Sequence, residues 1–404
     1  MATSTSPFAV LLLPISTLPV PRGQLKAQYG RTLEAALRHS RPNDQSTSRL
    51  DIALLLKDVA ANRSALFDPI QHLLADVYTL VCMIAAQHKI ELDFPGGIDV
   101  RLFIVDLSAT DNNVSPLTGP LISASTFAAS KRHYKHWYAP ESLHTSHHVK
   151  QLLQQLHQNI EALPEGQPST NPETTPQTPS SSKHSTSSPH HRVAVGGTFD
   201  HIHIGHKLLL TATIFTAQPS ATQHREITIG TTGDELLVNK KHAKVLESWE
   251  TRQSRTADFI ESILVFPDSA DANDISSLRT IQHIDEPGPN GKIVRVIYSD
   301  QKTGEKVTVN YTRISDPFGP TITDESISAL VISAETRAGG QAVNDKRGEK
   351  GWAPLEVFEV DVLDAGSDER EQDGKVERTT FDSKISSTEI RRRLAAASPL
   401  TAGL

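Results

Sequence analysis

A stretch without large apolar side chains occupies the middle of this chain, where residues 164–190 read PEGQPSTNPETTPQTPSSSKHSTSSPH. It is rich in proline, serine and threonine and contains no Leu, Ile, Val, Met, Phe, Tyr or Trp. Such a segment cannot bury enough apolar surface to offset the entropy lost on ordering. We therefore predict a disordered linker over residues 164–191, which divides the 404-residue chain into an amino-terminal region, 1–163, and a carboxy-terminal domain, 192–404.

The amino-terminal region alternates elements of both kinds. Residues 8–15 and 98–106 are apolar runs that predict strands, and the apolar spacing of residues 69–88 predicts a helix. This region is therefore expected to be a smaller α/β unit. No glycine-rich loop, metal-ligand spacing or nucleophile motif stands out in its sequence, so its role is left open.

Strands and helices alternate along the carboxy-terminal domain, which predicts a parallel sheet covered on both faces. Ligands of such sheets bind at the carboxyl ends of the strands. The polar segment 267–292 is expected to be an insertion loop, and residues 294–298 and 306–313 are expected to form a hairpin. The other predicted strands are residues 193–195, 227–232, 329–333 and 355–362, and the predicted helices are residues 205–215 and 250–264.

Composition excludes several classes of protein. The net charge of −7 gives no overall attraction to nucleic acid, and the sequence lacks a basic patch interleaved with aromatic residues. The longest apolar runs, residues 8–15 and 78–86, are shorter than the roughly 20 residues of a membrane-spanning helix, so no membrane association is expected. Cys82 is the only cysteine, which excludes an intrachain disulfide and indicates a reducing, cytoplasmic location.

A double glycine follows the first predicted strand of the carboxy-terminal domain, in the sequence VAVGGTFDHIHIGHKLLL. Gly196 and Gly197 allow a tight turn and a close approach of a ligand to the backbone. The helix that begins near Gly205 directs amide N–H groups to the same place, a geometry that suits a phosphate. His203 and His206 lie at the start of this helix, and Gly205 leaves room for a nucleotide.

The histidines of this stretch also allow a metal site, because imidazole is a common ligand of zinc. No fitting carboxylate or thiol accompanies His201, His203 and His206 in the local sequence, which makes the metal site the weaker interpretation. An ordinary core or surface position is the alternative for any one of the three.

A second motif, ISSTEIR, lies near the carboxyl end of the chain. Ser386 is followed three residues later by Glu389, the spacing of a capping box that opens a helix. The free N–H groups of that helix end, the hydroxyls of Ser387 and Thr388 and the guanidinium of Arg391 would together suit a polyphosphate. Taken alone, the motif could equally be a capped, basic surface helix.

The two motifs together resemble those of the nucleotidylyltransferase superfamily, which are a HIGH tetrapeptide, here residues 203–206, and ISSTxxR, here residues 385–391. Class I aminoacyl-tRNA synthetases share the HIGH sequence, but their KMSKS loop is not found in this chain. Within the superfamily the chain resembles the phosphopantetheine adenylyltransferases of eukaryotic, fungal type. That resemblance rests also on residues 231–241, 315–321 and 333–347, and it implies a Rossmann-like fold.

The resemblance implies transfer of AMP from ATP to 4′-phosphopantetheine, which gives dephospho-CoA and pyrophosphate in coenzyme A biosynthesis. Mg²⁺ would accompany ATP, no metal bound by the protein itself is implied, and other enzymes of the CoA pathway are potential partners. An attacking phosphate is already ionised near neutral pH. The protein must therefore supply positioning and charge stabilisation rather than a general base.

The resemblance also assigns roles to residues. His206, with His203 beside it, would donate to the α-phosphate, and Lys240 would bridge the two reacting phosphates, with Lys241 as the alternative. Asp200 would orient the loop or a ribose rather than act as a base. The residues implied on the acceptor side are Thr198, Asp200, Lys240 and Lys241, and those implied to bind ATP are Gly197, Thr198, Phe199, His206, Arg337, Asn344, Arg347, Ser386, Ser387, Thr388 and Arg391.

Two alternative functions remain open at the level of sequence. One is a nucleotidylyltransferase with another acceptor, such as nicotinamide mononucleotide or a phosphorylated alcohol. The other is a non-catalytic scaffold that binds a CoA-pathway metabolite, although the presence of both phosphate motifs argues against it. The sequence does not indicate the oligomeric state.

Overall fold

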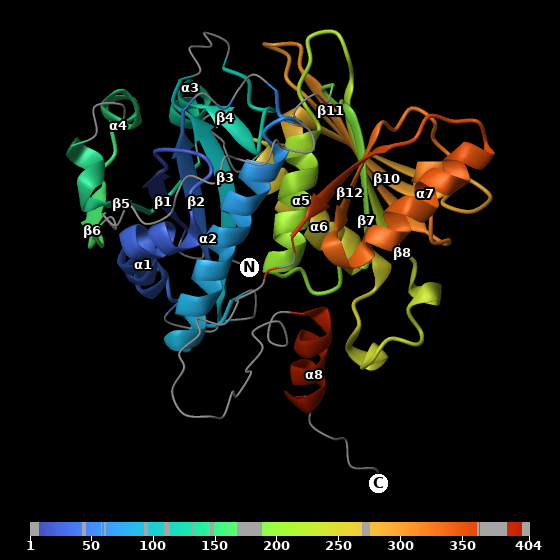
Figure 1. Ribbon diagram of the computed structural model, residues 1–404, viewed down its shortest axis with the longest axis horizontal. Coiled ribbons are helices and arrows are strands. Elements are labelled where there is room, and N and C mark those ends of the chain that lie inside the picture. Colours follow the sequence, from blue (N-terminus) through green and yellow to red (C-terminus); the bar gives the residue numbers. More distant parts are fainter. Residues whose placement is uncertain are drawn as a thin grey trace.

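The computed structural model describes residues 8–42, 46–57, 59, 62–92, 96–108, 114–130, 132–145, 149–167, 188–268, 275–361, 363 and 386–397. These residues form two β-sheets, one from each side of the predicted linker, with helices packed on them (Figure 1). Positions 168–187 of that linker lie outside the described residues. The ends of the linker are packed, because the carbonyl oxygen of Pro164 accepts a hydrogen bond from Thr32 and the side chain of His190 contacts Ser328 and Glu356.

The amino-terminal sheet consists of six parallel strands in the order β4-β3-β2-β1-β5-β6. The two apolar runs predicted to be strands are β1 and β3, and the predicted helix is α2. Their nearly continuous burial is typical of strands in a parallel sheet covered on both faces. The elements are β1 (Phe8–Pro14), α1 (Arg22–His39), β2 (Ser48–Leu56), α2 (Phe67–Gln87), β3 (Ile98–Asp106), β4 (Leu121–Ser123), α3 (Ala124–Ala129), β5 (His136–Pro140), α4 (Lys150–Leu156) and β6 (Glu161–Leu163).

The carboxy-terminal sheet has the order β13-β12-β7-β8-β11-β10-β9, and its strands from β13 to β11 are parallel. In chain order these parallel strands are arranged 5-4-1-2-3, as in a Rossmann-like sheet, which confirms the predicted fold class. The direction of winding reverses between β7 and β12, and ligands of such sheets bind in the crevice at that point. The elements are β7 (Arg192–Gly197), α5 (Ile204–Thr216), β8 (Arg225–Thr232), α6 (Trp249–Leu264), β9 (Arg279–Asp285), β10 (Lys292–Ser299), β11 (Lys306–Ile314), β12 (Ala329–Ser333), α7 (Arg337–Glu349), β13 (Glu356–Val360) and α8 (Ser387–Ala397).

The prediction of an insertion loop over residues 267–292 is wrong in part. Strand β9 lies within this segment and pairs antiparallel with β10. It is the edge strand and most of its side chains are exposed, so it lacks the buried alternation by which a strand is recognised in a sequence. The hairpin predicted next to it is confirmed as β10 and β11.

A shared hydrophobic core joins the two sheets. Helix α2 lies along α5 between them (Figure 1), and buried side chains from both halves form one cluster. Phe266, just after α6, packs edge-on against Phe103 of the amino-terminal sheet. By length and composition alone α2 could cross a membrane, but 67% of its apolar window is buried inside the protein. Packing between two layers accounts for a helix that is apolar on more than one face.

Candidate active site

A cavity of about 750 Å³ opens at the carboxyl ends of the parallel strands of the second sheet. Its centre is formed by the turn after β7 and by the start of α8. One arm extends to the segments after β8 and β11, where Leu236, Lys240 and Phe318 line it. The other arm extends to the segments after β12 and β13, where Ser333 and Asp361 line it. The cavity therefore lies in the crevice where such a sheet binds ligands, and its two arms offer separate places for two of them.

The turn after β7 brings bare backbone to the cavity, as the double glycine predicts. A Cβ atom at Gly197 would lie 2.9 Å from the ring of Phe199, so no side chain fits there. Phe199 is buried and has a φ of 51°, in the left-handed region that residues with side chains rarely adopt. Gly205 is restricted in a similar way, because its Cβ position lies 3.2 Å from the ring of His203. The backbone strain at Phe199 marks a site whose shape is strongly constrained.

His203 and His206 stack at the start of α5 with their ring centroids 3.9 Å apart. Both line the cavity, and the Nδ1 atom of each is buried without a hydrogen-bond partner in the described part of the chain. Burial lowers the pKa of His206 to about 4 and the pKa of His203 well below its usual value. Each ring is therefore neutral near pH 7 and carries one N–H donor. The pair is suited to donate hydrogen bonds rather than to neutralise charge.

A buried ion pair joins the turn to α8. Arg391 donates to the carboxylate of Asp200 at 2.5 Å, and the two side chains are 3% and 0% exposed. Arg391 also donates to the carbonyl oxygen of Lys241 at 3.0 Å. The hydroxyl of Ser387 donates to the carbonyl oxygen of Asp200 and lies 3.3 Å from Nε2 of His203. The two phosphate motifs of the sequence therefore meet around one cavity.

This ion pair alters what two residues were expected to do. Asp200, implied on the acceptor side, does not line the cavity and instead holds Arg391. Arg391 does line the cavity, but its charge is already balanced by Asp200. The first residues of α8 line the cavity as expected, and Ser386 caps the helix by accepting the N–H of Glu389 at 3.2 Å. The helix end rather than the arginine is therefore the part of this motif that is available to an anion.

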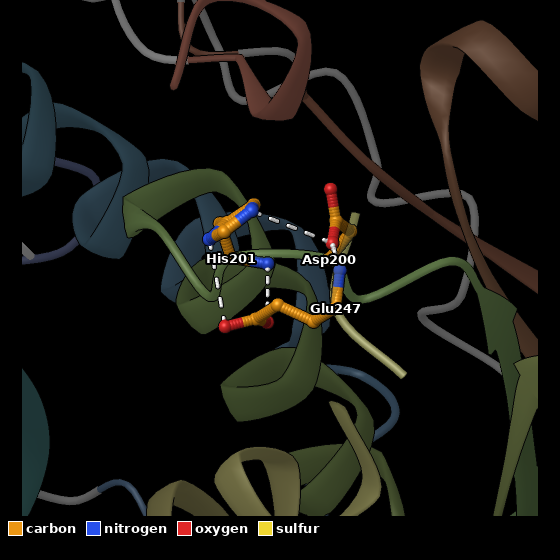
Figure 2. Close-up of side chains that lie close together, drawn as sticks. All are labelled: Asp200, His201 and Glu247. Carbon is orange, nitrogen blue, oxygen red and sulfur yellow. Dashed lines mark hydrogen bonds and ion pairs between the residues drawn. The ribbon is translucent and has the colours of Figure 1, made fainter. Parts of the chain in front are cut away.

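Figure 2 shows Asp200, His201 and Glu247 together, with ligand-type atoms that lie within 4.8 Å of one another. Glu247 supplies the carboxylate that the local sequence lacks, so the metal interpretation has to be tested again. Both carboxylates already have cationic partners, because Arg391 pairs with Asp200 and Arg255 pairs with Glu247. The backbone N–H of His201 also donates to Glu247 at 2.9 Å. The cluster therefore fixes the segment before α6 against the turn, and its donor set does not favour a metal.

The two lysines left open by the sequence take different positions. Lys240 is exposed and lines the cavity. Lys241 does not line it, and its carbonyl oxygen instead accepts a hydrogen bond from Arg391. Lys240 is therefore the lysine that can reach a ligand in the cavity, together with Thr198 of the turn, which also lines it.

Three residues that were expected to bind ATP do not line the cavity. Arg337 is exposed and pairs with Glu359. The side-chain amide of Asn344 accepts the N–H of Leu355 at 2.8 Å and donates to its carbonyl oxygen at 3.0 Å. Arg347 is 1% exposed. Its guanidinium donates to the backbone carbonyl oxygens of Thr321, Asp324, Glu325, Ile327 and Ala353. The donors of Asn344 and Arg347 are thus used to hold α7, and this placement does not support contacts with ATP.

Arg347→Met is therefore expected to reduce stability and leave nucleotide binding intact. The loss should be on the order of 3 kcal/mol, because several backbone carbonyl groups lose a charged donor at once. Urea unfolding of parent and variant measures this difference, and calorimetric titration of the folded variant with Mg·ATP should give an unchanged Kd. A weaker Kd at unchanged stability would return Arg347 to the nucleotide site.

Sequence analysis did not identify Arg252, a fully buried residue of α6 that fixes the turn from below. Its guanidinium donates to the carbonyl oxygens of Thr198 and Thr232 at 2.6 and 2.8 Å and to the carboxylate of Asp234 at 2.6 Å. It thereby ties the ends of β7 and β8 to α6. No local motif distinguishes it from a surface arginine of a polar helix, so its long-range contacts alone reveal this role.

Lowering the pH is expected to destabilise the protein through the buried histidine pair. The pKa of His206 is about 4 in the folded chain, whereas an unfolded histidine titrates near 6.5, so the unfolded state binds more protons between these values. This contribution to stability is complete above pH 6.5 and is lost as the pH falls toward 4. Urea midpoints measured between about pH 7 and pH 4.5 should fall less steeply for His206→Asn than for the parent. Equal slopes would show that the parent ring is solvated rather than buried.

Known proteins resemble about half of this chain. An uncharacterized protein of Schizosaccharomyces pombe is 31% identical over 202 residues, which are 50% of this chain and 48% of that protein. The phosphopantetheine adenylyltransferase of Saccharomyces cerevisiae is 35% identical over 210 residues, 52% of this chain and 50% of the relative. The phosphopantetheine adenylyltransferase of Methanosarcina mazei is 30% identical over 172 residues, 43% of this chain but 80% of the relative. This chain belongs to the phosphopantetheine adenylyltransferase family.

The relation to phosphopantetheine adenylyltransferases leaves much of the chain without a named counterpart. The chain spans about half the length of the two yeast relatives that it matches. Residues 1–174 match a family described as Domain of unknown function (DUF8446), which includes the whole amino-terminal sheet. A solved structure of a protein with unknown function from Archaeoglobus fulgidus, 21% identical, covers 42% of this chain and 98% of its own with a TM-score of 0.26, which is too low to inform the fold.

Proposed function

We propose that this chain transfers the AMP moiety of ATP to 4′-phosphopantetheine and so produces dephospho-CoA and pyrophosphate for coenzyme A biosynthesis in the cytoplasm. The observation that carries the proposal is the meeting of the two phosphate motifs around one cavity, with His203 and His206 on one side and the start of α8 on the other. The names of the relatives from Saccharomyces cerevisiae and Methanosarcina mazei support the choice of acceptor.

The chemistry asks for alignment and charge stabilisation. An oxygen of the acceptor phosphate attacks the α-phosphorus of ATP, and the bond from that phosphorus to the bridging oxygen of the β-phosphate breaks. Pyrophosphate leaves with the bonding electrons, and Mg²⁺ enters as part of the Mg·ATP substrate. No proton has to be removed from an acceptor that is already ionised. The N–H donors of His203 and His206 and the ammonium group of Lys240 suit the charge that develops on the α-phosphate.

The two arms of the cavity suit the two substrates. The phosphates would lie at the centre, between the turn after β7 and the N-terminus of α8, where backbone N–H groups and histidine donors meet. The acceptor would occupy the arm with Leu236 and Lys240, which offers apolar surface and a cation. The nucleoside of ATP would occupy the arm that leads to β12 and β13.

Single-turnover assays with the full chain and ATP labelled at the α-phosphate test this function. Separate reactions would contain 4′-phosphopantetheine, nicotinamide mononucleotide or a phosphorylated alcohol as the acceptor. We expect label transfer to 4′-phosphopantetheine with release of pyrophosphate. Transfer to another acceptor alone would replace the proposal with a different nucleotidylyltransferase, and ATP binding without pyrophosphate release would indicate a non-catalytic scaffold.

A further inference from the structure

One residue of the cavity is held in place by the amino-terminal region. Asp361 directly follows β13 and lines the arm that leads to β12 and β13. Gln71 and His72 of α2 both contact its Oδ2 atom, through the amide nitrogen of Gln71 at 3.2 Å and Nε2 of His72 at 3.0 Å. The side-chain oxygen of Gln71 also accepts the backbone N–H of Asp361 at 3.2 Å. A single glutamine thus fixes both the backbone and the carboxylate of Asp361.

This contact belongs to a wider junction between α2 and the end of β13. Gln71 is 3% exposed, and Phe67, one turn earlier on α2, packs edge-on against Phe358 with ring centroids 4.9 Å apart. A second cavity of about 400 Å³ lies between α1, α2 and this junction. It shares Asp361 and Leu363 with the main cavity, so the two spaces adjoin at these residues. The outer wall of the β12–β13 arm is therefore built partly by the amino-terminal region.

The contacts of Asp361 leave one of its oxygens available. The hydrogen bond from His72 holds the pKa of Asp361 below its usual range, and the same bond raises the pKa of His72. Asp361 is therefore ionised near neutral pH. Both contacts from α2 end on Oδ2, and no described residue bonds Oδ1. A charged, unshared acceptor consequently faces the cavity.

The charge of Asp361 limits what can lie beside it. A carboxylate repels phosphate groups but accepts hydrogen bonds from hydroxyl and amino groups. The end of the β12–β13 arm therefore suits the neutral end of a nucleotide, whereas the phosphates remain near His206 and α8. We propose that Asp361 accepts a hydrogen bond from the nucleoside part of bound ATP, and that Gln71 and His72 of the amino-terminal region hold it in position for this contact. The inference rests on the proposed function in taking ATP as the ligand.

Calorimetric titration of the full chain with Mg·ATP tests the contact without requiring turnover. Asp361→Ala should weaken the Kd for Mg·ATP roughly tenfold, the lower end expected for one hydrogen bond to a charged group. Asp76→Asn is the matched control, because Asp76 also lies on α2 and lines the second cavity but does not line the main one. Its Kd should equal that of the parent. An unchanged Kd for Asp361→Ala would overturn the proposal.

Nucleotide analogues identify the donor on the ligand. The triphosphates of 2′-deoxyadenosine, 3′-deoxyadenosine and purine riboside each lack one donor of ATP. One of them should bind the parent roughly tenfold more weakly than ATP does, and should lose nothing further with Asp361→Ala. If every analogue loses the same factor with the variant as ATP does, Asp361 acts without a contact to the nucleoside and the inference is wrong.

The part played by α2 needs variants of its own. Gln71→Leu and His72→Leu should each weaken the Kd for Mg·ATP by a few-fold, while His72→Gln, which keeps an N–H donor, should recover most of the affinity. In steady-state assays the change should appear in KM for ATP and not in kcat or in KM for the acceptor. Parent-like ATP affinity in both leucine variants would remove the amino-terminal region from the site. Because binding is measured without an acceptor, failure of 4′-phosphopantetheine as a substrate would count against the proposed function alone.

Discussion

Replacing His206 with alanine is expected to lower kcat by roughly 10²-fold or more, the scale for loss of one preorganised donor to a developing oxyanion. His206 lines the cavity, and its buried Nδ1 atom has no partner among the residues that the structure describes. Because the low pKa keeps the ring neutral, the loss should reflect a missing N–H donor and not a missing charge. Pyrophosphate release by purified parent and variant measures the effect, with KM for each substrate determined in parallel.

The controls separate this role from a general loss of structure. His224→Ala removes another histidine, one that bonds Thr308 at the opposite end of the sheet, and it should turn over like the parent. His206→Asn keeps a polar N–H group and should lose less activity than His206→Ala. Urea unfolding would show that both His206 variants remain folded under assay conditions. Equal turnover by parent and His206→Ala would exclude His206 from the reaction.

The parts of this site that could be predicted from sequence are those with local signatures. The glycines after β7, the histidines at the start of α5 and the cap of α8 each follow from short-range rules about turns and helix ends. Their meeting at one cavity also followed, because carboxyl ends of parallel strands share one edge of a sheet. The resemblance to a known family supplied the partner motif, ISSTEIR, that physical rules alone left ambiguous.

Arginine contacts could not be predicted in this way. Arg252, Arg347 and Arg391 are all donors on helices, and nothing in their local sequences tells which carbonyl or carboxylate each will reach. Arg391 meets Asp200 across 191 positions of sequence, and Arg347 binds carbonyl groups from two separate loops. The expected ATP contact of Arg347 was therefore replaced by a structural one. Burial of a guanidinium depends on packing that a linear pattern does not contain.

The relation between the two halves was also missing from the sequence analysis. A linker lacking large apolar side chains suggested separate units, whereas α2 and α5 pack together and contribute to one core. A signal was present, because α2 is apolar on more faces than one sheet can cover. A helix with that composition needs a second layer, and the carboxy-terminal domain provides it. The loop predicted in place of β9 failed for the opposite reason, since an exposed edge strand has little apolar pattern.

Asp99→Ala is expected to destabilise the whole protein by about 3 kcal/mol or more, because it leaves a buried lysine without its counter-charge. Lys207 follows His206 in the sequence, is 3% exposed, and donates to Asp99 of the amino-terminal sheet at 2.6 Å and to the carbonyl oxygen of Val100 at 3.2 Å. Burial opposes ionisation of Asp99, but Arg101 and Lys207 outweigh it and hold its pKa below the usual range. The pair therefore ties the helix that carries the histidines to the other half of the chain.

The reverse variant sharpens this prediction. Lys207→Met should cost less, about 1 kcal/mol, because Arg101 still pairs with Asp99 at 2.6 Å and methionine fills much of the vacated space. Urea unfolding followed by fluorescence and by circular dichroism should give one transition that shifts as a unit in each variant, since the two sheets share a core. Two transitions, of which only the one belonging to the amino-terminal sheet moves with Asp99→Ala, would mean that the halves unfold independently. In that case the ion pair could not transmit the stability of one half to the helix that carries His206.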